Sequence, residues 1–322
     1  MKKFENIEQI INYEFPKFNI STIKKIGEGD NSKAFLINQN YIFRFPKREV
    51  VKQNLKKEIA VLAKIRSLLN LEIPNFNFIS KEINFVGYKS ISGEFLTIKI
   101  YNSLEKELQS QIQKSLAGFL SQLHNIDLTI LTDCELETMN YKEEYSNDFK
   151  STQKLIFPNI STKYRKIITQ LFTTYLDNQK NFEYRPALIH NDFSTDHILF
   201  EISSNKISGI IDFGDLAIGD PDYDLMYLLD SFGQGFIMKM LNFYGFPNQK
   251  VLKEKLYFFT LANKLQITIG SIKEDARYSI KNNYANLERW MREYEKRKSE
   301  LFSKKKLRSS LSFAFPMQFP PC

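Results

Sequence analysis

Short runs of β-branched and aromatic residues dominate the start of the chain, and helical spacing of apolar residues dominates the rest. Residues 19–47 alternate such runs with Gly- and Asn-containing turns, a pattern that predicts three strands joined as a meander. From 51 to 69, apolar residues recur at helical spacing, which predicts an amphipathic helix that carries Glu58. Residues 75–80 and 83–91 have the composition of two further strands. We therefore expect a five-stranded lobe with one inserted helix.

Beyond residue 100 the apolar periodicity becomes mainly helical. It predicts helices over residues 104–124, 141–156, 161–182, 221–244, 250–271 and 281–302. The exception is 188–212, where short apolar runs predict strands separated by polar loops. The expected fold class is α+β, with a small β-sheet lobe over 1–92, a larger and mainly helical lobe over 93–302, and a cleft between them. Residues 303–322, basic and then Pro-containing, are expected to be irregular.

The composition is that of a globular protein, with 43% hydrophobic and 25% charged residues. These proportions exclude a disordered chain and a membrane-embedded one. Acidic residues interrupt the N-terminal segment where a signal peptide needs an apolar stretch. Because Cys134 and Cys322 are the only cysteines, a reducing compartment without a disulfide framework is indicated. We expect a cytoplasmic monomer that does not bind membranes.

The net charge of +8 is concentrated near the C-terminus, where residues 295–308 hold seven Lys or Arg against two Glu. A solvated helix end explains this basic run best, and we expect no nucleic-acid partner. Binding of RNA or DNA by the run stays an alternative, and it would make retention on nucleic acid strongly salt-dependent.

Two short segments carry residues suited to catalysis. In HNDFSTDHILF (190–200), Asp192 lies in a loop between apolar runs, five residues before His197. In GIIDFGD (209–215), Asp212 directly follows an apolar strand. Phosphoryl transfer needs one group that accepts or orients the proton of the attacking hydroxyl, and others that hold Mg²⁺ against the nucleotide phosphates. The combination favours a phosphotransferase over a pair of hairpins with Asx turns.

These segments resemble the catalytic loop and the IDF segment of the aminoglycoside phosphotransferase family, which has a protein-kinase-like fold. The stretches HNDFSTDHILF and IDFGDLAIGDPDYD are most similar to those of the aminoglycoside 2″-phosphotransferases. The resemblance implies Mg²⁺ as cofactor and ATP or GTP as phosphoryl donor. It also implies Asp192 as the catalytic base, His197 and Asp212 as metal ligands, and His190 as scaffold. His197 stands where the broader family has Asn, and its neutral imidazole offers one lone pair to the metal.

The resemblance extends to a phosphate-covering loop. GEGDNS (27–32) lies between two predicted strands, and its small residues let backbone amides approach phosphate oxygens. The nucleotide-binding residues implied here are Gly27, Gly29 and Ser32.

The third predicted strand, YIFRFPK (41–47), has Arg44 at the position where kinases carry a Lys that contacts the phosphates. The resemblance implies that Arg44 pairs with Glu58 on the following helix. Arg keeps the charge but places it on a longer, planar group. Lys47 is the alternative cation, should the strand register differ.

KSISGEFLT (89–97) is similar to the family's hinge, which would span residues 88–93. Ile91 is then the residue implied to contact the nucleotide base through backbone groups. Main-chain recognition of this kind does not distinguish ATP from GTP.

Six Asp and no Lys or Arg lie between residues 211 and 230. Such a concentration predicts an electronegative side of the cleft, which attracts a polycation such as an aminoglycoside. Asp220 before Pro221 is also suited to cap a helix, and Asp224 resembles the family's brace of the catalytic loop. The substrate-binding residues expected are Asp215, Asp220, Asp222 and Ser194.

Together these features predict a kinase that transfers the γ-phosphoryl group of ATP or GTP to an aminoglycoside hydroxyl, the 2″ position by resemblance, and so causes antibiotic resistance. Three alternatives remain open at this point. One is a kinase for another hydroxyl compound, such as a macrolide or a choline-like alcohol. Another is a nucleotide-binding pseudo-enzyme, which Arg44 would suit, and the third is the nucleic-acid binder named above.

Overall fold

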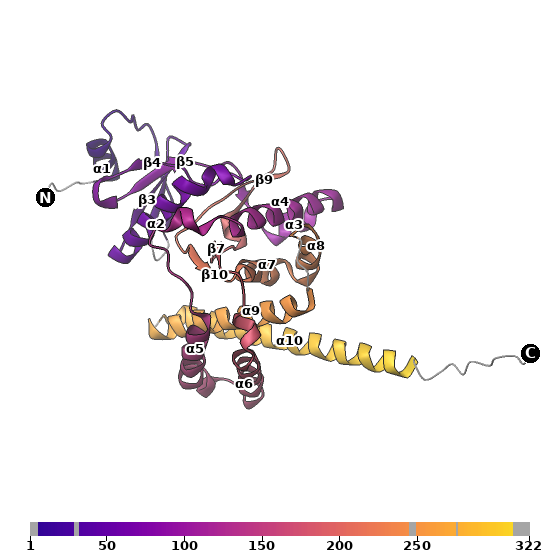
Figure 1. Ribbon diagram of the computed structural model, residues 1–322. Coiled ribbons are helices and arrows are strands. Elements are labelled where there is room, and N and C mark those ends of the chain that lie inside the picture. The colour runs from indigo at the N-terminus through magenta and orange to yellow at the C-terminus, as the bar shows by residue number, and fades with distance from the viewer. Residues whose placement is uncertain (1–5, 29–31, 245–248, 275, 312–322) are drawn as a thin grey trace, which may run out of the picture. The chain divides into compact units, whose positions relative to one another are not determined.

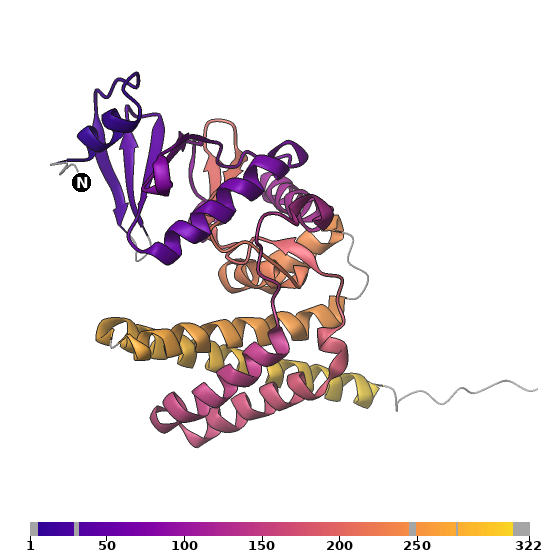
Figure 2. The same ribbon diagram turned by 60° about the vertical axis from the view of Figure 1, so that its left-hand side comes forward.

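The computed structural model describes residues 6–28, 32–244, 249–274 and 276–311. The chain divides into two compact units, whose elements are shown in Figures 1 and 2. Unit 1 comprises residues 1–139 and 183–256, and unit 2 comprises residues 140–182 and 257–322. The α+β class is confirmed, with an N-terminal antiparallel sheet followed by a mainly helical part.

Unit 1 begins with helix α1 (Ile7–Glu14) and a five-stranded antiparallel sheet (Figure 1). Its strands are β1 (Ile23–Glu28), β2 (Ser32–Ile37), β3 (Tyr41–Pro46), β4 (Phe76–Ile79) and β5 (Val86–Lys89), in the order β1-β2-β3-β5-β4. The turn between β2 and β3 has Asn38 and Gln39 at φ values of 51° and 60°. Left-handed values of this kind let the chain reverse within the three residues between the two strands, and Asn tolerates them well. The meander predicted over 19–47 is therefore present.

Helix α2 (Glu49–Ile65) packs against β3. Its buried face consists of Val51, Leu55, Glu58, Val61, Leu62 and Ile65. Glu58 is the one charged residue in this row, and its side chain is fully buried. The same spacing that buries the apolar face of the helix thus also buries the Glu58 carboxylate.

The second part of unit 1 combines short strands with helices. Strands β6 (Glu94–Phe95), β8 (Ile198–Glu201) and β9 (Lys206–Ile210) form one sheet, and β7 (Ala187–Ile189) pairs with β10 (Ala217–Gly219). The helices are α3 (Ile98–Ser103), α4 (Lys106–His124), α7 (Asp224–Phe232) and α8 (Gln234–Tyr244). Helix α4 packs against β7 and α8. The strands predicted within 188–212 are therefore present, and the polar loops between them hold the predicted catalytic residues.

Gly93 lies at the predicted hinge with a φ of 121°, which side chains rarely tolerate. A Cβ there would lie 2.8 Å from the carbonyl oxygen of Phe200 and 2.9 Å from Ser208 Oγ. We expect Gly93→Ala to lower the free energy of unfolding, measured by urea denaturation, by about 1–3 kcal/mol. Gly235→Ala is the matched control, because a Cβ at this position in α8 meets no atom within 4 Å; it should be neutral or stabilising. Equal effects of the two substitutions would contradict this prediction.

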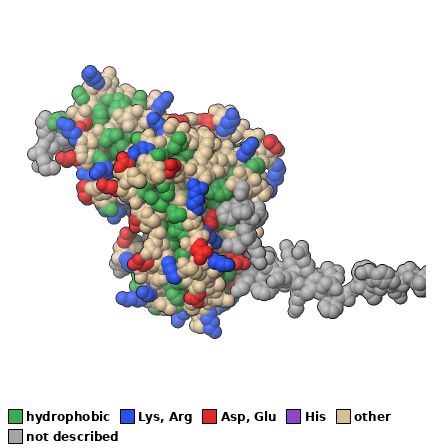
Figure 3. All heavy atoms as spheres, in the orientation of Figure 1, with side chains coloured by type: hydrophobic (Ala, Val, Ile, Leu, Met, Phe, Trp, Pro, Cys, Tyr) green, Lys and Arg blue, Asp and Glu red, His purple; other side chains and the backbone are tan. Residues whose placement is uncertain are grey.

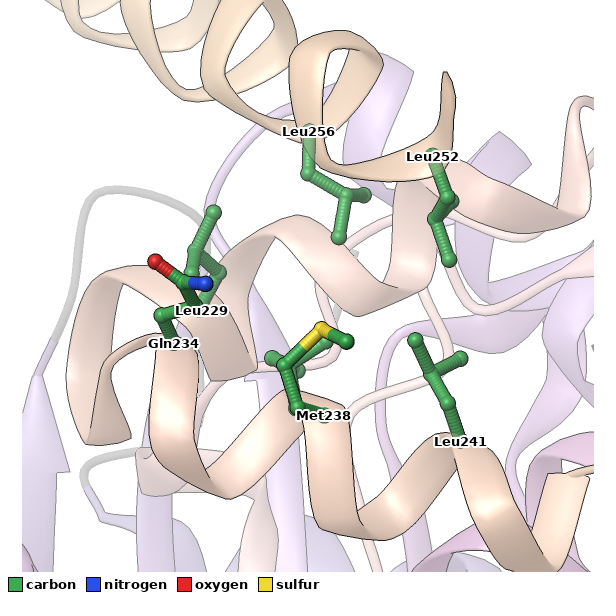
Figure 4. Close-up of a pocket in the computed structure, with 7 residues that line it drawn as sticks. Leu229, Gln234, Met238, Leu241, Leu252 and Leu256 are labelled. Carbon is green, nitrogen blue, oxygen red and sulfur yellow. The ribbon is translucent and has the colours of Figure 1, made fainter. Parts of the chain in front are cut away.

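A small apolar pocket lies between α8 and the first turns of helix α9 (Gln249–Lys273), and Figure 4 shows the side chains that line it. Leu252 and Leu256 of α9 point toward Met238 and Leu241 of α8. This apolar contact fixes the start of α9 on unit 1, with consequences for Lys255 described below.

Unit 2 contains α5 (Tyr141–Leu155), α6 (Thr162–Asp177), residues 257–273 of α9, and α10 (Arg277–Leu311). Aromatic side chains form much of its core. The rings of Tyr175 and Phe258 are stacked with centroids 3.7 Å apart, and Phe258 also contacts Phe172. Trp290 is buried and stacks on Tyr294, so it serves in packing.

Helix α10 extends through Leu311, so residues 303–311 are helical and not irregular as expected. The reason is that Lys, Arg and Leu are good helix formers, and the first Pro of the tail is Pro316. The side chains of the basic run from residue 297 onward, and residues 312–322, lie outside the described part of the chain. The expected lobe boundary near residue 92 does not coincide with a boundary between the compact units, because unit 1 contains the elements on both sides of it.

Acidic and basic side chains are interspersed over the face shown in Figure 3. No described helix combines the length and apolar character that crossing a membrane requires.

Candidate active site

The predicted catalytic loop follows β7 and is fixed by Asp224, a fully buried carboxylate at the start of α7. The backbone N–H groups of His190 and Asn191 donate to its two oxygens at 2.9 and 2.8 Å. Asn191 has a φ of 67°, a conformation that Asn adopts more readily than most residues. The contacts expected of Asp224 with the catalytic loop are therefore present, and they fix the backbone just before Asp192.

His124, at the end of α4, extends this network. Its Nε2 lies 2.9 Å from Asp224 Oδ2, and its Nδ1 lies 2.6 Å from the hydroxyl of Tyr244. His124 was not among the residues predicted from the sequence, although one signal pointed to it. The chain has three His, and all three lie around this loop.

His190 links the catalytic loop to the segment that precedes Asp212. Its Nε2 donates to the carbonyl of Ile211 at 3.1 Å, and its Nδ1 accepts from the N–H of Asp192 at 3.3 Å. Burial lowers the pKa of His190 to about 4, so the ring is neutral and can fill both roles at once. These contacts agree with a scaffold role for His190.

The side chains of Asp192 and Asp212 both approach that of His197. Pairing of β8 with β9 places Ile198 opposite Ile210, and the N–H of Ile211 donates to the carbonyl of His197 at 2.9 Å. As a result, His197 Nε2 lies 3.5 Å from Asp212 Oδ2, and His197 Nδ1 lies 3.5 Å from Asp192 Oδ2.

The hydrogen bonds of His197 also define its tautomer. Nδ1 lies 2.8 Å from the carbonyl oxygen of Asp192, which can only accept. Nδ1 must therefore carry the hydrogen, so that in the neutral ring Nε2 presents its lone pair on the side of Asp212. This is the arrangement that a metal-binding imidazole requires.

Burial raises the pKa of Asp192 to about 6, with His197 opposing the shift and the nearby acidic residues adding to it. At neutral pH most Asp192 carboxylates are ionised, yet the group is more basic than an ordinary aspartate. A more basic carboxylate accepts a proton from a hydroxyl more readily.

The cation on β3 is Arg44, and it meets the partner expected for it. Its Nη1 lies 3.1 and 3.2 Å from the two oxygens of Glu58, and its Nη2 lies 3.2 Å from Asp212 Oδ1. Burial raises the pKa of Glu58, while Arg44 and the N–H of Phe213 oppose that shift. Lys47 instead pairs with Glu28 of β1 at 2.9 Å. The strand register therefore selects Arg44.

The remaining residues expected to contact the nucleotide lie in β1, in β2 and just after β5. At Gly27, beside a bulge in β1, a Cβ would meet no atom within 4 Å. The Oγ of Ser32, at the start of β2, is buried and has no hydrogen-bond partner among the residues that the structure describes, so it can serve a ligand oxygen. Ile91 is buried after β5, and Gly29 lies outside the described residues.

The four residues expected to bind substrate are in different surroundings. Asp215 is exposed, whereas burial, followed by the charge of Asp212, raises its pKa. Ser194 lies within the catalytic loop, where its Oγ is 3.4 Å from His197 Nδ1 and its N–H donates to the carbonyl of Asp192.

Asp220 and Asp222 are 1% and 6% exposed, and both contact the ammonium of Lys255. This corrects the expectation that these two carboxylates face a substrate. Asp220 does cap the following turn, because its Oδ1 accepts from the N–H of Asp222. The sequence did contain a signal for Lys255, which lies beside Leu256 and three residues after Leu252 on the apolar face of α9.

The residues around Asp212 fit a magnesium ion that takes only some of its ligands from the protein. Within the described ranges, no three His, Cys, Asp or Glu side chains are grouped closely enough to hold a metal by themselves. Mg²⁺ is commonly held by one or two carboxylates together with phosphate oxygens and water. Asp212 Oδ2 supplies a carboxylate oxygen on one side of the site, and His197 Nε2, 3.5 Å from it, adds a nitrogen.

Fold and site together define a phosphotransferase with a kinase-like architecture, and comparison with known proteins identifies the family. The chain belongs to the phosphotransferase enzyme family, whose sequence profile matches residues 22–252. The predicted family and kinase-like fold are thereby confirmed.

Among solved structures, the GDP and kanamycin complex of APH(2″)-IIIa is similar with a TM-score of 0.85 and 27% identity, covering 89% of this chain and 98% of that one. The streptomycin–ATP ternary complex of APH(2″)-IIa is similar with a TM-score of 0.69 and 28% identity, covering 84% and 91%. The uncharacterized protein YcbJ of Bacillus subtilis (strain 168) is 21% identical over 213 residues, which are 63% of this chain and 67% of that protein.

Proposed function

We propose that this protein transfers the γ-phosphoryl group of ATP or GTP to the 2″ hydroxyl of an aminoglycoside in the cytoplasm, and that it thereby inactivates the antibiotic. The observation that carries this proposal is the position of His197, within 3.5 Å of both Asp192 and Asp212. The arrangement brings a proton acceptor next to a pair of metal ligands, which is the combination that phosphoryl transfer uses.

Each residue of the site has a separate task in this proposal. Asp192 orients the acceptor hydroxyl and takes its proton as the oxygen attacks the γ-phosphorus. His197 and Asp212 hold Mg²⁺, which when bound neutralises charge on the phosphates. Arg44, kept in place by Glu58, adds a fixed positive charge on the nucleotide side. Most of the rate then comes from positioning and charge neutralisation.

Gly27 and Ser32 support the nucleotide's phosphates in this proposal. The orphaned Oγ of Ser32 is the observation that favours a ligand oxygen there, since buried hydroxyl groups are rarely left without a partner. Gly27 leaves open space beside the backbone. Ile91 follows β5 at the proposed hinge and is the residue whose backbone would meet the base.

The aminoglycoside part of the proposal rests on charge and on the relatives. The carboxylates of Asp192, Asp212 and Asp215 make the electrostatic potential of the site more negative. Asp212 and Asp215 both raise the pKa of Asp192, and Asp212 raises the pKa of Asp215. A substrate with several ammonium groups is attracted to such a site. The similar solved structures include complexes with kanamycin, streptomycin and gentamicin.

The test is a coupled phosphorylation assay with ATP and GTP over kanamycin-type, gentamicin-type, macrolide and choline acceptors. We expect turnover on at least one aminoglycoside, with the phosphate located at the 2″ oxygen by NMR of the product. Turnover on a macrolide or choline alone would assign a different substrate class. Nucleotide binding without any turnover would indicate a pseudo-enzyme and contradict the proposal.

A further inference from the structure

Arg44 uses its two terminal nitrogens for two different carboxylates. Nη1 contacts both oxygens of Glu58, and Nη2 contacts Oδ1 of Asp212. The two nitrogens of a guanidinium are held apart in one rigid plane, whereas a Lys has a single ammonium nitrogen. An ammonium at this position could not reproduce both contacts without movement of a partner.

The two oxygens of Asp212 therefore have different surroundings. Oδ1 accepts from Arg44 at 3.2 Å, and Oδ2 lies 3.5 Å from His197 Nε2. Asp212 has a φ of 63°, and its neighbour Phe213 donates its N–H to Glu58. Arg44 and Glu58 thus hold the Asp212 segment from the side of the sheet.

From this division of the carboxylate we infer that Arg44 sets the divalent-cation requirement of the enzyme by holding Asp212 Oδ1 and leaving Oδ2 with His197 for the cation. The inference rests on the proposed nucleotide and metal site, but not on the identity of the acceptor. Two physical effects act in the same direction. A guanidinium in contact with the carboxylate repels a cation that approaches it, and a carboxylate with one oxygen engaged cannot bind a cation through both.

The difference in burial between the two partners of Arg44 decides which contact a lysine at position 44 would lose. Glu58 is fully buried and Arg44 is 16% exposed, whereas Asp212 is 49% exposed. A buried ion pair keeps its partners strongly, so a Lys at position 44 is expected to stay with Glu58. Asp212 is then released, and both of its oxygens become available to a cation.

The experiment measures binding of a fluorescent nucleoside triphosphate analogue at increasing Mg²⁺ concentration, without any acceptor. We expect Arg44→Lys to lower the Mg²⁺ concentration for half-maximal nucleotide binding by about fivefold or more, the lower end of typical coupling between two sites. Ca²⁺, which accepts both oxygens of a carboxylate, should gain more than Mg²⁺ in the same titration.

Glu58→Gln is a second variant with the opposite expected sign. Removing the negative charge leaves Arg44 less neutralised and strengthens its pairing with Asp212, so the half-maximal Mg²⁺ concentration should rise. An unchanged or raised Mg²⁺ midpoint in Arg44→Lys, with thermal unfolding like that of the wild type, would overturn the inference. Since no acceptor is present, failure of the aminoglycoside proposal would leave this result untouched.

Discussion

Replacing Asp192 with Asn is expected to lower kcat by about 10³-fold, within the range that a positioned general base contributes. The amide keeps the size of the side chain and can still accept a hydrogen bond, but it cannot take the hydroxyl proton. The loop should remain in place, because Asp224 fixes it through the N–H groups of His190 and Asn191 and not through the Asp192 side chain. Steady-state kinetics with the preferred aminoglycoside measures the effect.

Nucleotide affinity in the presence of Mg²⁺ is the companion measurement for Asp192→Asn. It should change little, since His197 and Asp212 are intact in the variant. Asp215→Asn is the matched control: it removes one exposed carboxylate near the same site, and we expect it to raise KM for the aminoglycoside more than it lowers kcat. A kcat for Asp192→Asn within tenfold of the wild type would rule out Asp192 as the base.

The grouping of the three side chains proposed for catalysis and metal binding could be predicted because they lie close together in the sequence. Asp192 and His197 are five residues apart in one loop, and Asp212 follows the next hairpin, so short-range strand pairing brings them together. Arg44 and Glu58 were also predictable, since a strand register and the helical spacing of α2 determine which side chains meet. In each case the partners lie on elements whose pattern is visible in the sequence.

Contacts between distant elements were harder to predict. His124 contacts Asp224 across 100 positions, and Lys255 contacts Asp222 across 33. A helix pattern shows which face is buried, but not which element covers that face. The acidic run from residue 211 to 230 was therefore interpreted as one electronegative surface. In the structure, Asp220 and Asp222 are buried, and both form ion pairs with Lys255 of α9.

The extent of the C-terminal helix was also underestimated. The predicted helix ended at residue 302, yet α10 continues to Leu311. Charged residues with long, unbranched side chains do not interrupt a helix, and Pro or Gly are needed to end one reliably.

Lys255→Met is expected to lower the free energy of unfolding at pH 7 by about 3–5 kcal/mol, the usual cost of removing one partner from a buried ion pair. The ammonium lies 2.5 Å from Asp220 Oδ2 and 2.6 Å from Asp222 Oδ2, and it is also close to the ring of Tyr184. Without it, two carboxylates stay buried and lose the counter-charge that Lys255 provides. Methionine keeps the apolar length of the side chain, so the loss of unfolding free energy reflects mainly the missing charge. Urea denaturation measures it.

The pH dependence of that loss separates charge from packing. Burial already raises the pKa of Asp220 to about 6, above its ordinary value of 3.8, so the folded protein holds this proton more tightly than the unfolded chain. Such a group contributes most to stability at low pH, and its contribution falls as pH rises toward 6. Removing the ammonium of Lys255 raises the pKa further, so the variant's deficit should be larger at pH 7.5 than at pH 5. Lys239→Met, an exposed lysine on α8, should stay within about 0.5 kcal/mol at both pH values. An equal deficit for Lys255→Met at pH 5 and 7.5 would mean that packing, and not the buried charges, determines the effect.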